Sequence, residues 1–164
     1  MSSKNEIKEE IETAFADVTL DGGISLNQTK IIDNYGRDCT AEVFKAMPRG
    51  EETGDWRRIT VAALDDADCL AHLDRKGFRF YIPALMSRLL DQYDPDSMMT
   101  IGTLSILYPK TESWPYLYSL LSKQQLSAVA NFLRFLPVIV ELEGEDIKVV
   151  ERSFRNYWSQ FLSA

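Results

Sequence analysis

The chain has 164 residues, a formal net charge of −7 and 45% hydrophobic residues. Enough apolar side chains are present to build a core, so this composition excludes a disordered chain. The surplus of acidic groups repels phosphate backbones, and we therefore predict no nucleic-acid partner.

The sequence also lacks the signals of a membrane or exported protein. Its longest apolar run, residues 132–140, contains Arg134 and Pro137 and is far shorter than the roughly 20 residues that span a bilayer. Near the N-terminus Lys4 and Lys8 are outnumbered by glutamates, so the cationic and then apolar order of a signal peptide is missing. We therefore predict no membrane association and a cytoplasmic location.

The N-terminal part predicts one amphipathic helix followed by shorter ones. Ile7, Ile11 and Phe15 recur every four residues among lysines and glutamates, which is typical of a helix with one buried face. Three short helices are predicted beyond it: one capped by Ser25 and closed by Gly36, one from Thr40 to Met47 before Pro48, and one capped by Thr60. Residues 48–55 are polar and contain two glycines, so they predict an exposed loop.

A longer central helix is predicted to begin after Asp74, which can cap it. Phe78 and Ile82 lie on one stripe of this helix. Pro83 lies inside it and removes one amide donor, so we expect a kink there. The alternative is an extended strand over residues 78–81, for which the sequence offers no convincing partner strand.

The C-terminal half predicts further helices between clear breaks. A turn at residues 94–96 precedes a helix over residues 98–107, and Pro115 suits the first turn of the next helix. Ser122 and Gln125 form a capping box for a helix that continues through Leu136. After an acidic break, apolar residues from Ile147 to Phe161 recur at steps of three and four and predict a helix docked on the core.

These elements together predict an all-α fold. No repeat, low-complexity tract or linker divides the chain, so residues 1–164 are predicted to form a single helical domain. Its architecture is expected to be one irregular bundle of about seven to eight helices, with a proline-kinked central helix.

Catalytic chemistry finds little support in the residues. The motifs of the common hydrolases, nucleotide-binding proteins and metalloproteases are absent. His72 is the single histidine; Cys69 could pair with it, but a packed cysteine beside a surface histidine explains the same residues. Asp65, Asp66 and Asp68 lack the glycine and terminal glutamate of an EF-hand loop, and a solvated helix end is the simpler interpretation. We predict no catalytic residue, no cofactor and no metal site.

Four residues are predicted to bind a partner, namely Trp56, Arg79, Tyr81 and Trp114. The first three would form one surface near the proline kink. Trp114 belongs to an aromatic cluster with Tyr116, and exposed aromatic rings often anchor partners at binding hot spots. Packing in the core is the alternative interpretation for these rings.

Positive charge is concentrated in the middle of the chain. It indicates either a site for an anion or acidic partner, or surface ion pairs with the carboxylates of residues 65–74, and the ion pairs are the simpler interpretation. The residues concerned are Arg57, Arg58, Arg75, Lys76, Arg79 and Arg88.

Three stretches of the sequence carry a family resemblance. They are residues 56–59 (Trp-Arg-Arg-Ile), 77–85 (Gly-Phe-Arg-Phe-Tyr-Ile-Pro-Ala-Leu) and 125–133 (Gln-Leu-Ser-Ala-Val-Ala-Asn-Phe-Leu). With the N-terminal amphipathic helix that ends near Phe15, they resemble the bacterial family DUF6714, a domain of unknown function, over most of residues 5–160. The resemblance implies a bacterial, α-helical domain, and it transfers no activity because the family has no established reaction, cofactor or catalytic residues.

Three functions remain open from the sequence. We favour a non-enzymatic binding protein of the immunity or regulatory type, with a protein partner of unknown identity, because the chain is small, acidic, helical and poor in histidine. The second is an enzyme that uses Tyr81, Asp74 or Cys69 in a cleft near Pro83. The third is a structural subunit of a homo-oligomer.

Overall fold

The computed structural model describes residues 2–35, 54–66 and 70–162, and it confirms the all-α prediction. No strand occurs in these ranges, and residues 78–81, for which a strand was the alternative, are helical. The elements are α1 (Lys4–Ala14), α2 (Leu26–Tyr35), η3 (Trp56–Arg58), α4 (Val61–Asp65), η4 (Leu70–His72), α5 (Arg75–Asp91), α6 (Met98–Ile106), η5 (Trp114–Tyr118), α7 (Lys123–Ile139), α8 (Glu145–Asn156) and η6 (Trp158–Phe161), where η denotes a 3-10 helix.

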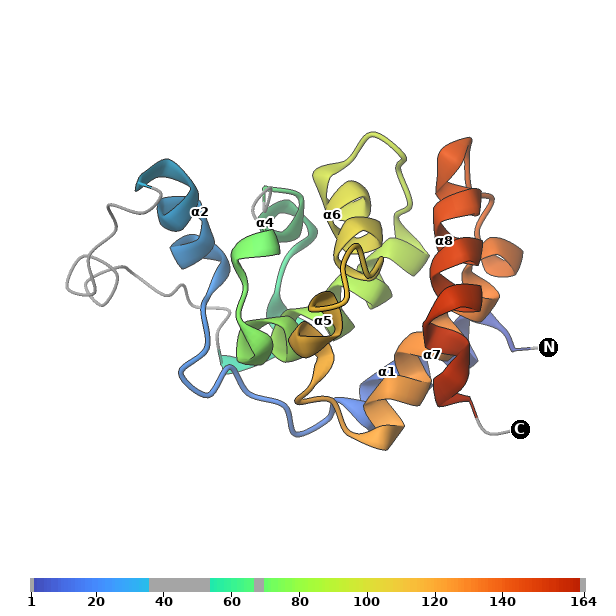
Figure 1. The fold of residues 1–164 in the computed structure, drawn as a ribbon, viewed down its shortest axis with the longest axis horizontal. Helices are drawn as coiled ribbons and strands as arrows, with labels where there is room; N and C mark the ends of the chain where they lie inside the picture. The colour runs from blue at the N-terminus through green and yellow to red at the C-terminus, as the bar shows by residue number, and fades with distance from the viewer. Residues whose placement is uncertain (1, 36–53, 67–69, 163–164) are drawn as a thin grey trace.

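Helix α5 lies in the middle of the bundle (Figure 1). It packs against α1 and α7, and also against α6, η3 and η5. The helices α1, α7 and α8 form one group with η6, while α2 and α6 meet at η4 and α4 packs on α6. Segments far apart in the sequence are thus brought together on the central helix.

Local capping explains where most of the helices begin. Ser25, Thr60, Asp74 and Ser122 each accept a hydrogen bond from the backbone N–H three residues later, as predicted. Such a bond satisfies one of the amides that the first turn of a helix leaves without a partner. The predicted helix between Thr40 and Met47, like Gly36, lies outside the described residues.

The central helix continues through Pro83 as one element of 17 residues. The predicted kink at this proline is not confirmed. Phe80, Tyr81, Ile82 and Pro83 are all buried, so the helix has apolar contacts on more than one face. Close packing on several sides holds the backbone in the helical path although one amide donor is missing.

The C-terminal segment differs from the single helix that its periodicity predicts. Helix α8 ends at Asn156, and Tyr157 leaves the helical region with φ −138° and ψ −60°. This change of direction turns the ring of Trp158 into the core, where its Nε1–H donates to the carbonyl oxygen of Leu107 at 2.8 Å. The Pro115 segment is also shorter than predicted, since η5 ends at Tyr118.

Across the described part of the chain, none of the helices combines the length and apolar character that crossing a bilayer requires.

Trp158 is a direct test of this core. It is fully buried and packs against the rings of Tyr118 and Phe161. We expect Trp158→Ala to lower the free energy of unfolding by about 3 to 5 kcal/mol, because it opens a cavity and removes a buried donor. Urea unfolding measures the loss, and Val138→Ala, at an exposed position of α7, is the control with an expected change within about 0.5 kcal/mol. Similar losses of unfolding free energy in both variants would show that Trp158 is not a buried core residue.

Tyr93 links two loops that are distant in sequence. Its hydroxyl donates to a carboxylate oxygen of Asp146 at 2.6 Å and accepts from the backbone N–H of Glu143 at 3.0 Å. Burial of the phenol, together with the bond to Asp146, raises the pKa of Tyr93 to about 12. The loop after α5 is thereby fastened to the start of α8.

This raised pKa predicts a loss of stability in base. The unfolded chain releases the Tyr93 proton near pH 10, whereas the folded chain keeps it until about pH 12. Stability is therefore full below about pH 10 and falls as the pH rises towards about 12. We expect Tyr93→Phe to unfold at lower urea concentration at pH 8 and to show a shallower fall above pH 10. An equal fall in both proteins would show that Tyr93 is not responsible.

Candidate functional site

The structure separates the four residues that the sequence predicts as binding residues. Trp56 is only 4% exposed, and its Nε1–H donates to the carbonyl oxygen of Phe15 at 2.9 Å. Tyr81 is fully buried, and its hydroxyl accepts from the backbone N–H of Leu26 at 3.2 Å. Both rings thus pack in the core, which was the alternative interpretation. Whether either one also contributes to binding stays a prediction.

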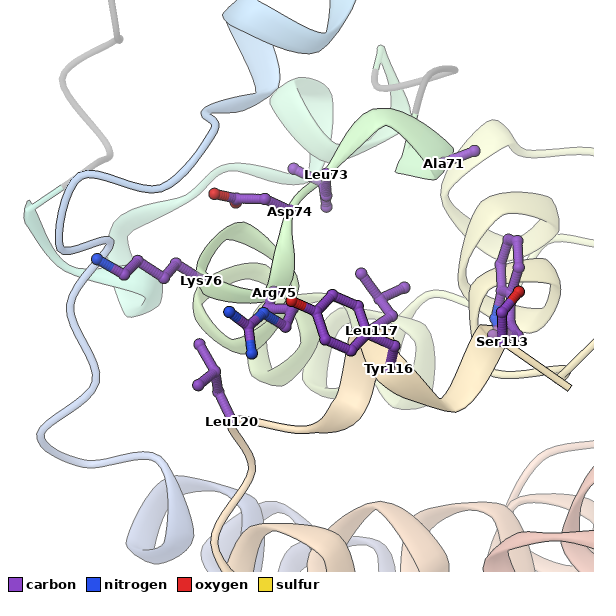
Figure 2. Close-up of a pocket in the computed structure, with 10 residues that line it drawn as sticks. Ala71, Leu73, Asp74, Arg75, Lys76, Ser113, Tyr116, Leu117 and Leu120 are labelled. Atoms are coloured by element: carbon purple, nitrogen blue, oxygen red, sulfur yellow. The ribbon is translucent and has the colours of Figure 1, made fainter.

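Arg79 and Trp114 are half-buried, but they line different cavities. Trp114 borders a groove of about 530 Å³ between the beginning of α5 and η5, which we call the η5 groove. Figure 2 shows Arg75 and Tyr116 side by side in it, with Leu117 behind them and Leu120 below. The groove is lined by Ala71, Leu73, Asp74, Arg75, Lys76, Ser113, Trp114, Tyr116, Leu117 and Leu120.

The aromatic wall of the groove is held by two hydrogen bonds to one carbonyl oxygen. Trp114 Nε1–H and the hydroxyl of Tyr118 both donate to the carbonyl of Ile106, at 3.1 and 2.7 Å. Burial raises the pKa of Tyr118, so its hydroxyl remains protonated and stays a donor. The short helix η5 is therefore anchored from beneath, while the ring of Tyr116 is 64% exposed.

Two cations stack on the aromatic rings of this segment. The guanidinium carbon of Arg75 lies 4.5 Å from the ring centroid of Tyr116, and Nη1 donates to Ser119 Oγ at 3.2 Å. Lys110 Nζ lies 5.5 Å from the ring centroid of Trp114. Neither cation takes part in an ion pair with a described residue, so their charge is available to a partner.

Asp74 is the acidic residue of the groove, and its carboxylate is used by the fold. Oδ1 accepts from the backbone N–H groups of Gly77 at 2.8 Å and Ile24 at 3.0 Å. The backbone of Ile24 lies so close to the first turn of α5 that a Cβ on Gly77 would lie 2.6 Å from the carbonyl oxygen of Ile24. Asp74 thus caps α5 and ties the segment before α2 to it, and is not a free catalytic acid.

A second apolar hollow adjoins the groove. It has a volume of about 130 Å³ and shares Ala71 and Trp114 with the groove. On its α6 side Met98 and Ile101 are 38% and 48% exposed. The apolar surface therefore continues from η5 across η4 to α6.

Within the described residues, none of the central cations forms an ion pair with a carboxylate of residues 65–74, which the simpler interpretation predicted. Arg57 pairs with Glu12 and Asp55, and Lys76 pairs with Asp21. Glu12 lies on α1 and Asp21 lies between α1 and α2, so these cations pair with carboxylates of other elements. Among the described residues of that range, Asp66 pairs with Lys30.

The proposed Cys69–His72 pair and the Asp65, Asp66 and Asp68 group both include residues outside the described ranges. Asp65 accepts from the backbone N–H of Met99 at the start of α6, which is a structural use. No group of three or more metal-ligating side chains is found within residues 2–35, 54–66 and 70–162.

Sequence reasoning identified Trp114 and the aromatic cluster, but it missed the groove. Arg75 and Tyr116 are 41 positions apart, and no periodic pattern connects them. Leu117 and Leu120 are half-buried and line the groove. The aromatic cluster around Tyr116 and the positive charge at Arg75 and Lys76 were the available signals in the sequence.

The double hydrogen bond of Asp74 generates a prediction. We expect Asp74→Ala to lower the free energy of unfolding by about 2 kcal/mol, because it removes a helix cap and leaves the Ile24 amide without its acceptor. Asp74→Asn keeps an oxygen in the same place and should lose less than half as much. Equal losses in urea unfolding would mean that the negative charge, and not the acceptor, matters.

Comparison with known proteins gives one match. The model of DUF6714, a family of unknown function, matches residues 3–162. No match was found among curated proteins or among solved structures. The resemblance carried by residues 56–59, 77–85 and 125–133 is thus confirmed, and no activity comes with it.

Proposed function

We propose that this chain, which belongs to the DUF6714 family, is a protein-binding module, and that its η5 groove takes an acidic segment of a partner protein. The observation that carries the proposal is the Arg75 guanidinium, stacked on the exposed ring of Tyr116 at an apolar groove without a carboxylate partner in the described chain. An immunity or regulatory role in the cytoplasm is the finer form of this proposal. It rests on the small size and acidic composition of the chain.

The residue types at the groove support a protein partner. Tyrosine, tryptophan and arginine are the side chains that dominate binding energy at protein interfaces. Tyr116 offers a large ring with few rotatable bonds, so little entropy is lost when a partner covers it. Arg75 is already oriented by Ser119 and by the ring of Tyr116, so its side chain loses less conformational entropy on binding.

The distribution of charge supports an acidic segment. The chain is acidic overall, so a carboxylate of the partner is attracted only where positive charge is locally uncompensated. Arg75 provides such charge over the ring of Tyr116, and Lys110 provides it over the ring of Trp114. A segment with acidic side chains at both cations and an apolar side chain between them matches this surface.

The groove does not favour the enzyme alternative. The described residues that line it include no histidine and no cysteine, and the one carboxylate among them, that of Asp74, accepts from two backbone donors. Tyr81 and Pro83, near which the catalytic cleft was expected, are buried. A nucleophile paired with a base, which hydrolytic chemistry requires, is missing from the groove.

A random-peptide library displayed against the purified chain tests the proposal. We expect the selected peptides to be enriched in Asp or Glu next to an aromatic residue or leucine. For one synthetic peptide from this set, Arg75→Glu and Tyr116→Ala should each weaken binding at least about tenfold in calorimetry. Replacing the acidic residue of the peptide by lysine should restore part of its affinity for Arg75→Glu.

The control is Arg134→Glu, because Arg134 also stacks on a ring, that of Phe135, and lies on α7 away from the groove. It should leave peptide binding unchanged. Peptides without acidic residues, or equal affinity for all variants, would contradict the proposal. A particle mass that is a multiple of 18.7 kDa, reduced by Tyr116→Ala, would instead assign the groove to self-association.

A further inference from the structure

Arg79 on α5 is a cation without a structural partner. Its Nε is buried and makes no hydrogen bond, and it is the single buried side-chain nitrogen or oxygen of the described residues in that state. The side chain as a whole is half-buried. Within the described part of the chain it forms neither a hydrogen bond nor an ion pair, in contrast to Arg57 and Arg88 on either side of it.

Such a position is costly for a structural residue. A buried donor without an acceptor loses its hydration and gains nothing in return, and the loss is larger for a charged group. A protein tolerates this cost at sites where a ligand supplies the missing acceptor. The buried Nε is closed to a ligand, but the terminal nitrogens of the same guanidinium are not buried and have no hydrogen-bond partner among the described residues, so they can bind one.

Arg79 lines a polar cavity of about 350 Å³ that is separate from the η5 groove. Thr13 and Asp17 border it at the end of α1, Thr19 follows them, and Gln124 borders it at the start of α7. Asp21 also lines the cavity, but its carboxylate is paired with Lys76. Asp17 has no ion pair among the described residues.

The two helices give this cavity opposite electrostatic ends. The C-terminus of a helix attracts cations and the N-terminus attracts anions. The last turn of α1 carries no basic residue and the first turn of α7 no acidic one, but the carbonyl oxygens of Ala14 and Ala16 already accept from Gln125 Nε2 and Arg57 Nη2, and the Gln125 amide donates to Ser122 Oγ. Asp17 adds negative charge to the α1 end, and the guanidinium of Arg79 adds positive charge to the cavity.

We propose that this cavity binds a small zwitterion of the free α-amino acid type. Its carboxylate lies against Arg79 and the start of α7, where the planar guanidinium can donate two parallel hydrogen bonds. Its ammonium group lies against Asp17. The volume accommodates a molecule of this size, and the site functions independently of protein binding at the η5 groove.

Thermal unfolding with each of the twenty free L-amino acids tests the proposal, with acetate, methylamine and inorganic phosphate as probes that carry one charge only. We expect at least one amino acid to raise Tm by about 5 °C at a concentration near 100 times its Kd. The single-charge probes should have no such effect. Arg79→Met and Asp17→Asn should each abolish the shift, and Arg134→Met should retain it.

The stability of Arg79→Met without ligand separates binding from a structural role. Because Arg79 makes no hydrogen bond, its removal should leave Tm unchanged or raise it. A lower Tm for the ligand-free variant would overturn the proposal, and so would the absence of any shift with all twenty amino acids. An equal shift with acetate or phosphate would also overturn it, in favour of a simple anion site.

Discussion

The fold is arranged around the need to cover α5. Eleven of its 17 residues are buried, and they point to more than one side of the helix. A helix that is apolar on several faces is not stable in water by itself, so α5 requires α1 and α7 from the two ends of the chain as well as α6 beside it. The same enclosure keeps the helix continuous through Pro83, although one amide donor is missing there.

The three tryptophans bind carbonyl oxygens that the helix ends leave without a backbone donor. Trp56 donates its indole N–H to Phe15 after α1, and Trp114 and Trp158 donate to Ile106 and Leu107 at the end of α6. Each indole therefore buries apolar area and satisfies a backbone acceptor at the same time. The aromatic character of residues 56 and 114, which predicted binding, thus has a structural use as well.

Arginines with a clear role in the fold differ from the two arginines that we assign to binding. Arg57 and Arg88 are fixed by carboxylates or backbone carbonyls, as expected of residues that stabilise the native state. Arg75 is oriented by Ser119 and Tyr116 but has no carboxylate in the described chain, and Arg79 has no partner there at all. The presence or absence of a carboxylate or carbonyl partner, more than residue type, separates the structural arginines from those proposed to bind.

The sequence by itself determined the all-α class, the family and most helix starts, because caps such as Ser122 with Gln125 and the spacing of Ile7 and Ile11 act within one or two turns. It did not determine which aromatic rings are buried. The η5 groove and the cavity at Arg79 each join segments 37 or more positions apart, and their lining follows from how α5 is covered. Only the tertiary structure could decide these sites, since burial and the pairing of distant charges depend on packing and not on local pattern.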